Sequence, residues 1–291
     1  MYNPFIEKID RDEDDLELIE VSLGGNQEAL EKLILRHQAW IYNIAFKMVM
    51  DHDDAGDITQ EILIKMITSL SSYNPQKGLF RTWIYRIVVN HIISMKKKKF
   101  EMRIQDFDTY VSLIEALPDD RDFAHPEREI LAEELKTGCV MGMLMCLNRT
   151  ERLVFLLGTV FGIADSVGAE IMEVTKVNFR KILSRSRQKI YSYMNGVCGL
   201  VNKNNPCRCE NKIKTFLELG MIDPRKPRFH RPEFQRVKDV IIERLDEFDQ
   251  SYYVPFLELF RKQPFYDAPD VTRWLRNMLQ NDEFKQLLNI H

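Results

Sequence analysis

Apolar positions recur every three or four residues between residues 80 and 92, and this spacing restricts the segment to one kind of structure. On an α-helix these positions share one side, so the pattern predicts a helix over residues 80–99 with a single buried face. Comparable spacing returns in most of the chain, and no segment shows convincing strand-like alternation. The sequence therefore predicts an all-α fold. The positions on this first stripe are Phe80, Trp83, Ile84, Ile87, Val88, His91 and Ile92.

The opposite side of this expected helix is polar, and the helix runs into four consecutive lysines. It carries Arg81, Tyr85, Arg86 and Asn90. Charge, stacking and hydrogen bonding from one face suit contact with nucleic acid. A core helix with a solvated basic end explains the same residues, so this stretch alone leaves both interpretations open.

Composition limits the class of protein. The chain has 291 residues and a formal net charge of −3, so a nucleic-acid site would have to be a local basic patch. No apolar run approaches the roughly 20 residues that span a bilayer, and the acidic N-terminus lacks a signal-peptide core. We therefore expect a cytoplasmic protein with no membrane span. Five cysteines, an odd number, argue against a secreted disulfide framework. The 6 histidines are scattered, so no catalytic site is expected.

Two more helices are expected before residue 80. Asn26 can cap a helix over about residues 27–50. After the acidic turn DHDDAGD, Asp53 or Asp54 can cap a second helix that ends near Leu70. The loop of residues 71–78 then has strong turn chemistry, and it leads directly into the polar-faced helix.

A second helical set is expected after residue 126, beyond a segment of weak periodicity. Within this set, short helices over residues 165–172 and 176–194 are joined by a turn at Glu173, and the second helix is rich in Arg and Lys. This layout is typical of a helix-turn-helix. The positions expected to pack inward from the second helix are Phe179, Leu183, Ser186 and Ile190.

Two groups of residues, taken together, resemble the bacterial extracytoplasmic-function sigma factors. The first group is similar to the family's promoter-melting domain and consists of Asp57–Glu61, Tyr73–Pro75, Gly78, Phe80–Ile87 and Asn90. The second is similar to its helix-turn-helix domain and consists of Leu147–Arg152, Gly162 and Leu183–Arg187. A helix-turn-helix alone would be weak support, but both groups occur in the family's order.

The resemblance implies a transcription initiation factor that binds core RNA polymerase, recognises promoter DNA and melts it, with no required cofactor and no enzymatic activity. It implies that Asp57, Gln60 and Glu61 dock on the clamp coiled coil of the polymerase. A solvated acidic helix face explains these three residues as well.

The resemblance also assigns the loop and the polar-faced helix to the −10 promoter element. Capturing a base flipped out of the duplex needs an apolar or aromatic wall and hydrogen bonds to the base edge. Trp83 is expected in the core rather than as a stacking platform. The residues that the resemblance places at this site are Tyr73, Asn74, Gln76, Arg81, Tyr85, Arg86, Asn90, Lys96 and Lys97.

The second domain is expected to read the −35 element from the major groove. The family pattern is broken at Ala164, where a capping hydroxyl is usual, at Gly168 inside the first helix, and at Glu173 in the turn. Asp165 or Ser166 could cap instead. The alternative function is therefore a sigma-like regulator or adaptor that relies on a partner for promoter choice. The residues expected at the −35 element are Lys176, Arg180, Lys181, Ser184 and Arg185.

These inferences divide the chain into five segments. The linker resembles the segment that the family threads through polymerase, and its acidic residues could mimic nucleic-acid charge or form a plain unstructured linker. The expected segments are an acidic N-terminal segment (1–24), a promoter-melting and polymerase-binding domain (25–99), a linker (100–126), a helix-turn-helix domain (127–194) and a C-terminal extension (195–291).

The extension begins with three cysteines, Cys198, Cys207 and Cys209. With a fourth ligand such as His230 they could hold a structural zinc. Free structural or redox-sensing thiols, or a disulfide, explain the same residues, and the spacing leaves these options open.

The rest of the extension is expected to form amphipathic helices over residues 233–248, 253–262 and 271–290. They could form a regulatory domain, a docking module for an anti-sigma or other regulatory protein, or a stabilising appendage.

Overall fold

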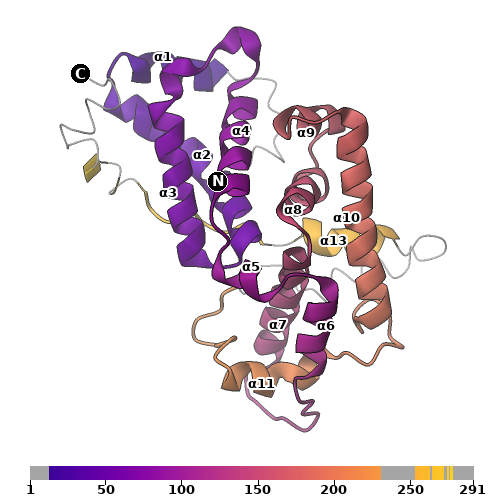
Figure 1. The fold of residues 1–291 in the computed structure, drawn as a ribbon. Helices are drawn as coiled ribbons and strands as arrows, with labels where there is room; N and C mark the ends of the chain where they lie inside the picture. The colour runs from indigo at the N-terminus through magenta and orange to yellow at the C-terminus, as the bar shows by residue number, and fades with distance from the viewer. Residues whose placement is uncertain (1–12, 231–252, 263, 272–273, 275, 278–291) are drawn as a thin grey trace. The chain divides into compact units, whose positions relative to one another are not determined.

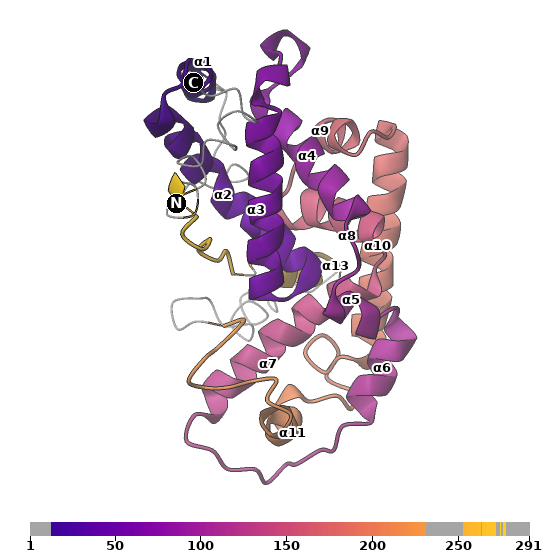
Figure 2. The same ribbon diagram turned by 60° about the vertical axis from the view of Figure 1, so that its left-hand side comes forward.

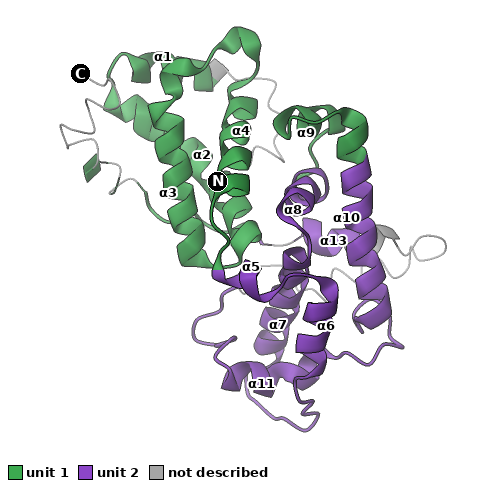
Figure 3. Ribbon diagram, in the orientation of Figure 1, with its two compact units in different colours: residues 1–98, 161–180, 265–291 green, residues 99–160, 181–264 purple. Residues whose placement is uncertain are grey.

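The computed structural model describes residues 13–230, 253–262, 264–271, 274, 276 and 277. Every regular element of these residues is helical, and no β-strand forms among them, which confirms the predicted all-α class. The helices gather into two compact units that do not follow the chain order (Figure 3). Unit 1 takes residues 1–98, 161–180 and 265–291, and unit 2 takes the remainder.

Unit 1 is built on three packed helices, with α3 lying along both α2 and α4 (Figures 1 and 2). Its elements are α1 (Glu13–Leu23), α2 (Gln27–Val49), α3 (His52–Thr68), η1 (Leu70–Ser72), η2 (Pro75–Lys77), α4 (Phe80–Ser94) and α9 (Asp165–Ile171).

Side-chain caps explain where α2 and α3 begin. The Asn26 side chain accepts a hydrogen bond from the backbone N–H of Ala29, as the sequence predicts. The cap of α3 is Asp51, whose carboxylate accepts bonds from the backbone N–H groups of Asp53 and Asp54. The predicted caps, Asp53 and Asp54, are therefore wrong by two or three positions, because both already lie inside the first turn.

The core of unit 1 is strongly aromatic. Trp40, Phe46 and Phe80 are fully buried, and the Trp40 ring lies 4.6 Å from the ring of Tyr85. Such rings bury large apolar areas, which stabilises a small helical unit. Helix α4 ends at Ser94, earlier than the predicted end at Lys99, and α5 begins at Lys99.

Unit 2 contains most of the remaining elements, and α10 (Lys176–Val197) contributes residues 176–180 to unit 1 and the rest to unit 2. Helix α8 begins with a capping box in which Asn148 and Glu151 each bond the other's backbone. The elements of unit 2 are α5 (Lys99–Arg103), α6 (Phe107–Glu115), α7 (Arg128–Gly142), η3 (Met143–Cys146), α8 (Arg149–Phe155), η4 (Leu156–Val160), η5 (Cys209–Lys212), α11 (Ile213–Glu218) and α13 (Tyr253–Arg261).

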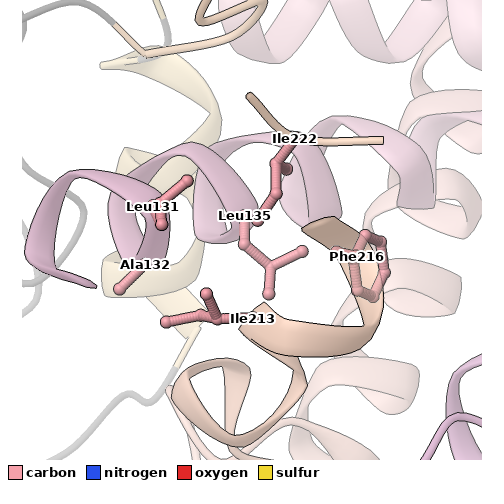
Figure 4. Packing of buried hydrophobic residues seen from close by; sticks show 6 residues of the cluster. All are labelled: Leu131, Ala132, Leu135, Ile213, Phe216 and Ile222. Atoms are coloured by element: carbon pink, nitrogen blue, oxygen red, sulfur yellow. The ribbon is translucent and has the colours of Figure 1, made fainter. Parts of the chain in front are cut away.

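A local apolar cluster joins α7 to the first part of the C-terminal extension (Figure 4). Helix α7 presents one buried stripe, and α11 covers it. This first part of the extension is thus packed into the core of unit 2. The buried members are Leu131, Ala132, Leu135, Ile213, Phe216 and Ile222.

The expected linker contains the short helices α5 and α6, although its sequence shows weak periodicity. Glu101 of α5 is only 4% exposed and accepts hydrogen bonds from Arg149 at 2.9 and 2.8 Å and from Arg152 at 3.2 Å. Further along, Asp119 pairs with Lys212 at 2.9 Å. Contacts with residues distant in sequence therefore order this segment, and some of its acidic groups already have internal cationic partners.

The described helices include none that is long and apolar enough to cross a membrane. The predicted helix over residues 253–262 is α13, which ends at Arg261. The predicted helix over residues 233–248 lies outside the described residues, as does most of the one over residues 271–290.

Candidate polymerase and nucleic-acid interface

The outer face of α3 is acidic and open. Asp57 and Glu61 are exposed, and Gln60 is half-buried. The Glu61 carboxylate lies 3.3 Å from the Nε2 atom of His91. Burial, and then the neighbouring Lys65, lower the pKa of His91, so the imidazole is neutral near pH 7 and its contact with Glu61 is not an ion pair.

The loop before α4 is held by its own residues. The Tyr73 hydroxyl donates to the Gly78 carbonyl at 3.0 Å, and the Tyr73 ring packs 5.1 Å from Phe80 and 5.7 Å from Trp83. The Asn74 side chain accepts from the backbone N–H of Gln76 at 2.9 Å and so caps η2. The structure therefore gathers the predicted loop residues around one aromatic wall.

The exposed side of α4 differs from its prediction at two aromatic positions. Tyr85 is only 3% exposed because its ring packs on Trp40 inside unit 1. Its predicted place on the outer face is therefore wrong, because it lies toward α2 rather than toward solvent. Trp83, predicted in the core, is half-buried and contacts Phe80 and Tyr73 beside the loop.

The polar residues of α4 stay accessible in part. Asn90 is exposed, whereas Arg81 and Arg86 are half-buried. Within unit 1, α9 packs against α4, and the Arg86 guanidinium lies 3.5 Å from the Glu170 carboxylate. A partner of α4 would therefore compete with Glu170 for Arg86.

The lysine run after α4 is divided between solvent and protein. Lys96 and Lys97 are exposed, while Lys98 forms an ion pair with Asp54 at 2.9 Å. Hydrogen bonding to Asp54 raises the pKa of Lys98. The two lysines expected to contact phosphate, Lys96 and Lys97, are thus exposed at the surface. Lys98 instead connects this lysine run to α3 through its ion pair with Asp54.

The helix-turn-helix departs from the family pattern at the three predicted positions, Ala164, Gly168 and Glu173, and close packing explains the departure at Gly168. A Cβ atom at Gly168 would lie 2.4 Å from the Phe179 ring, so glycine is needed for α9 to approach α10. Glu173 has a φ of 53°, in the left-handed region. Ala164 holds the N-cap position without a side-chain bond, so neither Asp165 nor Ser166 replaces the lost cap.

The inward positions of α10 are as predicted: Phe179, Leu183, Ser186 and Ile190 are all buried. Arg180 pairs with Asp165 across the motif. Arg187 donates to the Thr159 hydroxyl at 2.9 Å and to the Gly158 carbonyl at 3.0 Å, so its side chain contacts unit 2. The predicted −35 residues that are exposed on α10 are Lys176, Arg180, Lys181, Ser184 and Arg185.

The cysteines of the extension lie near one another and near Cys139 of α7. Cys198 and Cys207 form an isolated backbone bridge. Burial raises the pKa of Cys209, and so do its neighbours Cys139 and Cys198. Burial likewise raises the pKa of Cys139 to about 12. All of them are free thiols, and no set of three metal-binding side chains among the described residues is arranged to hold a metal ion.

Residues 33–100, from within α2 to the start of α5, match the sequence model of the sigma-70 region 2 family. The chain is 26% identical over 178 residues to the ECF RNA polymerase sigma factor SigE of Mycolicibacterium smegmatis, covering 58% of this chain and 64% of SigE. Residues 33–100 therefore carry a sigma-70 region 2, and the chain is similar to sigma factors of the extracytoplasmic-function type. The RNA polymerase sigma-H factor of Pseudomonas aeruginosa is 26% identical over 185 residues, covering 61% of this chain and 92% of that factor.

The chain spans less than two thirds of SigE, although it spans most of the sigma-H factor. Among solved structures, that of CnrH in complex with the cytosolic domain of CnrY is 19% identical with a TM-score of 0.43, covering 63% of this chain and 98% of CnrH.

Two polar clusters of the chain were not predicted from its sequence. One is the buried Glu101 with Arg149 and Arg152, and the other is the pairing of Asn43 with the backbone of Tyr266. A glutamate after a lysine run and an asparagine on an apolar helix face are the available signals. Neither residue type indicates which group it will contact, because the partners lie 48 to 223 positions away in the sequence.

Proposed function

We propose that this protein is a transcription initiation factor that binds core RNA polymerase, recognises promoter −10 and −35 elements and promotes DNA melting. The observation that carries the proposal is the region 2 match over residues 33–100, the part of the chain that bears the acidic α3 face, the Tyr73 loop and α4. On this proposal the protein acts in the cytoplasm, where polymerase and promoter DNA are found, and catalyses no reaction itself.

Polymerase docking is assigned to Asp57, Gln60 and Glu61 on α3. The support is their accessibility and the neutrality of the neighbouring His91, which leaves an acidic surface for a basic partner helix. Rim charges of this kind steer association and suppress wrong partners. Reversing the charge of Asp57 and Glu61 together should weaken core binding, whereas reversing Glu17 and Glu20 together on α1 makes the same charge change away from this face.

Promoter opening is assigned to the loop and α4. A flipped base needs an aromatic or apolar wall and donors and acceptors for its edge. Tyr73 is held against Phe80 and Trp83, and Asn74 and Gln76 stand exposed beside it. Asn90, Arg81 and Arg86 would follow the unpaired strand, and Lys96 and Lys97 would contact adjacent phosphates without sequence preference. Tyr85 is left out of this assignment because it is buried.

Recognition of the −35 element is assigned to the exposed side of α10. Lys181, Ser184 and Arg185 present one cationic and polar strip, and Arg180 shares its charge with Asp165. Arg contacts to guanine give base selectivity, and Lys contacts to phosphate give position.

The test is reconstitution with bacterial core RNA polymerase. The purified chain should co-elute with core, and the complex should give run-off transcripts with defined starts from the genomic fragments that it retains. Core alone is the control. A chain that neither associates with core nor directs transcripts would contradict the proposal.

The alternative is a sigma-like regulator or adaptor that needs a partner for promoter choice. It is motivated by the uncapped α9 and the left-handed Glu173, which weaken the helix-turn-helix. It predicts binding to core with no promoter-specific transcripts until an anti-sigma or other regulatory protein, bound through the extension, is added or removed.

A structural zinc on Cys198, Cys207 and Cys209 stays a prediction, and Cys139, which lies close enough to Cys209 to raise its pKa, is a further candidate fourth ligand beside His230. Zinc binding would require the thiols to rearrange and lose their protons. Metal analysis of the purified protein should give about one zinc per chain if the site exists, and a content near zero would remove it.

A further inference from the structure

A short segment near the C-terminus, residues 264–271, docks on α2 within unit 1. The side-chain carbonyl of Asn43 accepts from the backbone N–H of Tyr266, and the Asn43 amide donates to the backbone carbonyl of Tyr266, both at 2.8 Å. One side chain therefore satisfies both backbone groups of a single residue. These bonds involve only the peptide backbone, so they would bind an extended segment whatever its side chains, as backbone bonds do when a peptide adds to the edge of a sheet.

The side chain of Tyr266 supplies the specific part of the contact. Only 1% of it is exposed. Its ring lies 4.7 Å from the ring of Phe46 and 5.4 Å from that of His52, and the Lys47 ammonium lies 5.6 Å from its centre. An aromatic anchor in a closed pocket is the type of group that dominates peptide affinity.

Asn43 shows that the surface is built for this contact. It is fully buried on α2, and its amide also donates to the Ala39 carbonyl at 2.8 Å. Burying a carboxamide without partners is costly, and the Tyr266 backbone supplies the partner for its carbonyl oxygen. A helix face that needed only apolar packing would gain nothing from asparagine here.

The segment continues toward the face of α3 assigned to polymerase. A Cβ atom at Gly56 would lie 3.8 Å from the Pro269 ring, and Gly56 lies one helical turn before Gln60 on the same face. Beyond it, Arg276 forms an ion pair with Glu31 of α2 at 2.7 Å. The docked segment thus lies beside the docking residues without covering Asp57 or Glu61, which stay exposed.

We propose that α2 and α3 form a binding site for an extended, tyrosine-anchored peptide, that the chain's own residues 265–271 occupy it with Arg276 paired alongside, and that this occupancy opposes polymerase binding by α3. The second part rests on the proposed function. A polymerase helix that approaches Gln60 would meet Pro269, so the segment has to shift before the contact closes. By linkage, a ligand that binds only the undocked form gains affinity when docking is weakened.

Docking is tested first, without polymerase. Full-length Tyr266→Ala removes the anchor, and Asn277→Ala, an exposed position nearby, is the matched control. Hydrogen exchange should show lost protection over residues 264–271 in Tyr266→Ala and none lost in the control. Unchanged protection in Tyr266→Ala would overturn the binding site. Arg276→Glu, placed beside Glu31 at the surface, should give a smaller loss without touching the core.

The consequence for function is tested with core RNA polymerase and the same variants. Tyr266→Ala should bind core about tenfold more tightly than the unaltered chain, because it no longer spends part of its population in the docked form. A synthetic peptide of residues 264–276, added to Tyr266→Ala, should lower that affinity again. An affinity that is unchanged or weaker, with docking lost, would overturn the inhibitory role and make the segment a stabilising appendage.

The two failures can be told apart. If no form of the chain binds core, the proposed polymerase docking fails and the inhibitory role with it, while hydrogen exchange still decides the peptide site. If the chain binds core and Tyr266→Ala gains nothing, only the inhibitory role fails.

Discussion

The loop and α4 on one side, and the helix-turn-helix on the other, are both expected to contact promoter DNA, but they are held in different ways. The loop rests on close neighbours in the sequence, because Tyr73 packs on Phe80 and Trp83 and bonds to Gly78. The helix-turn-helix lacks a side-chain cap on α9 and carries a left-handed Glu173. The first site is therefore preformed, whereas the second depends on tight packing and on support from residues distant in the sequence.

The largest expected effect tests that distant support. Glu101→Gln removes the charge that Arg149 and Arg152 share at the start of α8. Removing one partner of a buried ion pair should lower the free energy of unfolding by about 3–5 kcal/mol. Urea unfolding followed by circular dichroism measures it, with the exposed Glu129→Gln as control. If Glu101→Gln loses no more unfolding free energy than Glu129→Gln, the helix-turn-helix region does not depend on the cluster of Glu101, Arg149 and Arg152.

The next prediction concerns the close approach within the helix-turn-helix. Gly168→Ala places a methyl group against the Phe179 ring and should cost about 1–3 kcal/mol of stability. Gly196→Ala, where a Cβ atom meets nothing within 4 Å, should be neutral or slightly stabilising and serves as the control. Protection of −35 DNA in footprints should fall in Gly168→Ala only. Equal behaviour of the two variants would remove the contrast between the regions.

A pH effect sharpens the description of unit 1. Burial lowers the pKa of Lys47 to about 7, whereas in the unfolded chain it stays near 10.5. Between these two pH values Lys47 is protonated to a greater extent in the unfolded chain than in the folded protein. The free energy of unfolding should therefore rise with pH over this range, by up to about 1.4 kcal/mol per pH unit. Between pH 7 and 8 the unaltered protein should gain stability that Lys47→Met does not. The same slope in Lys47→Met would assign the effect to another group.

The smallest effect is expected at the turn. Glu173→Gly relieves a left-handed conformation that costs an ordinary residue about 1 kcal/mol. The variant should therefore be more stable by about that amount and should bind −35 DNA at least as well. Thermal unfolding is the measurement, and a less stable variant would indicate that the Glu173 side chain has a role of its own.

The sequence predicts most local features because their causes are local. The Asn26 cap, the buried face of α10 and the positive φ at Glu173 all follow from residues within a few positions of one another. The position of Tyr85 could not be inferred in this way, because its burial depends on Trp40 from another helix.

Features set by distant partners were not predictable. Helix α5 is ordered through Glu101 by arginines 48 and 51 positions away. The Tyr266 segment depends on Asn43, 223 positions away. Periodicity describes one face of one helix, and it carries no information on which remote group will neutralise a buried charge or amide.

On the proposed function, the loop and α4 open promoter DNA, whereas α3 binds polymerase. A paired measurement of the two activities tests this division of roles. Core affinity and promoter opening, read from a fluorescent base in the −10 element, are compared for the unaltered chain, Tyr73→Ala, Asn90→Ala and the exposed control Ser71→Ala. We expect Tyr73→Ala and Asn90→Ala to lose about tenfold or more in promoter opening, the scale of a lost stacking contact, with core affinity unchanged. Equal loss of opening and core affinity, or full opening by Tyr73→Ala, would contradict it.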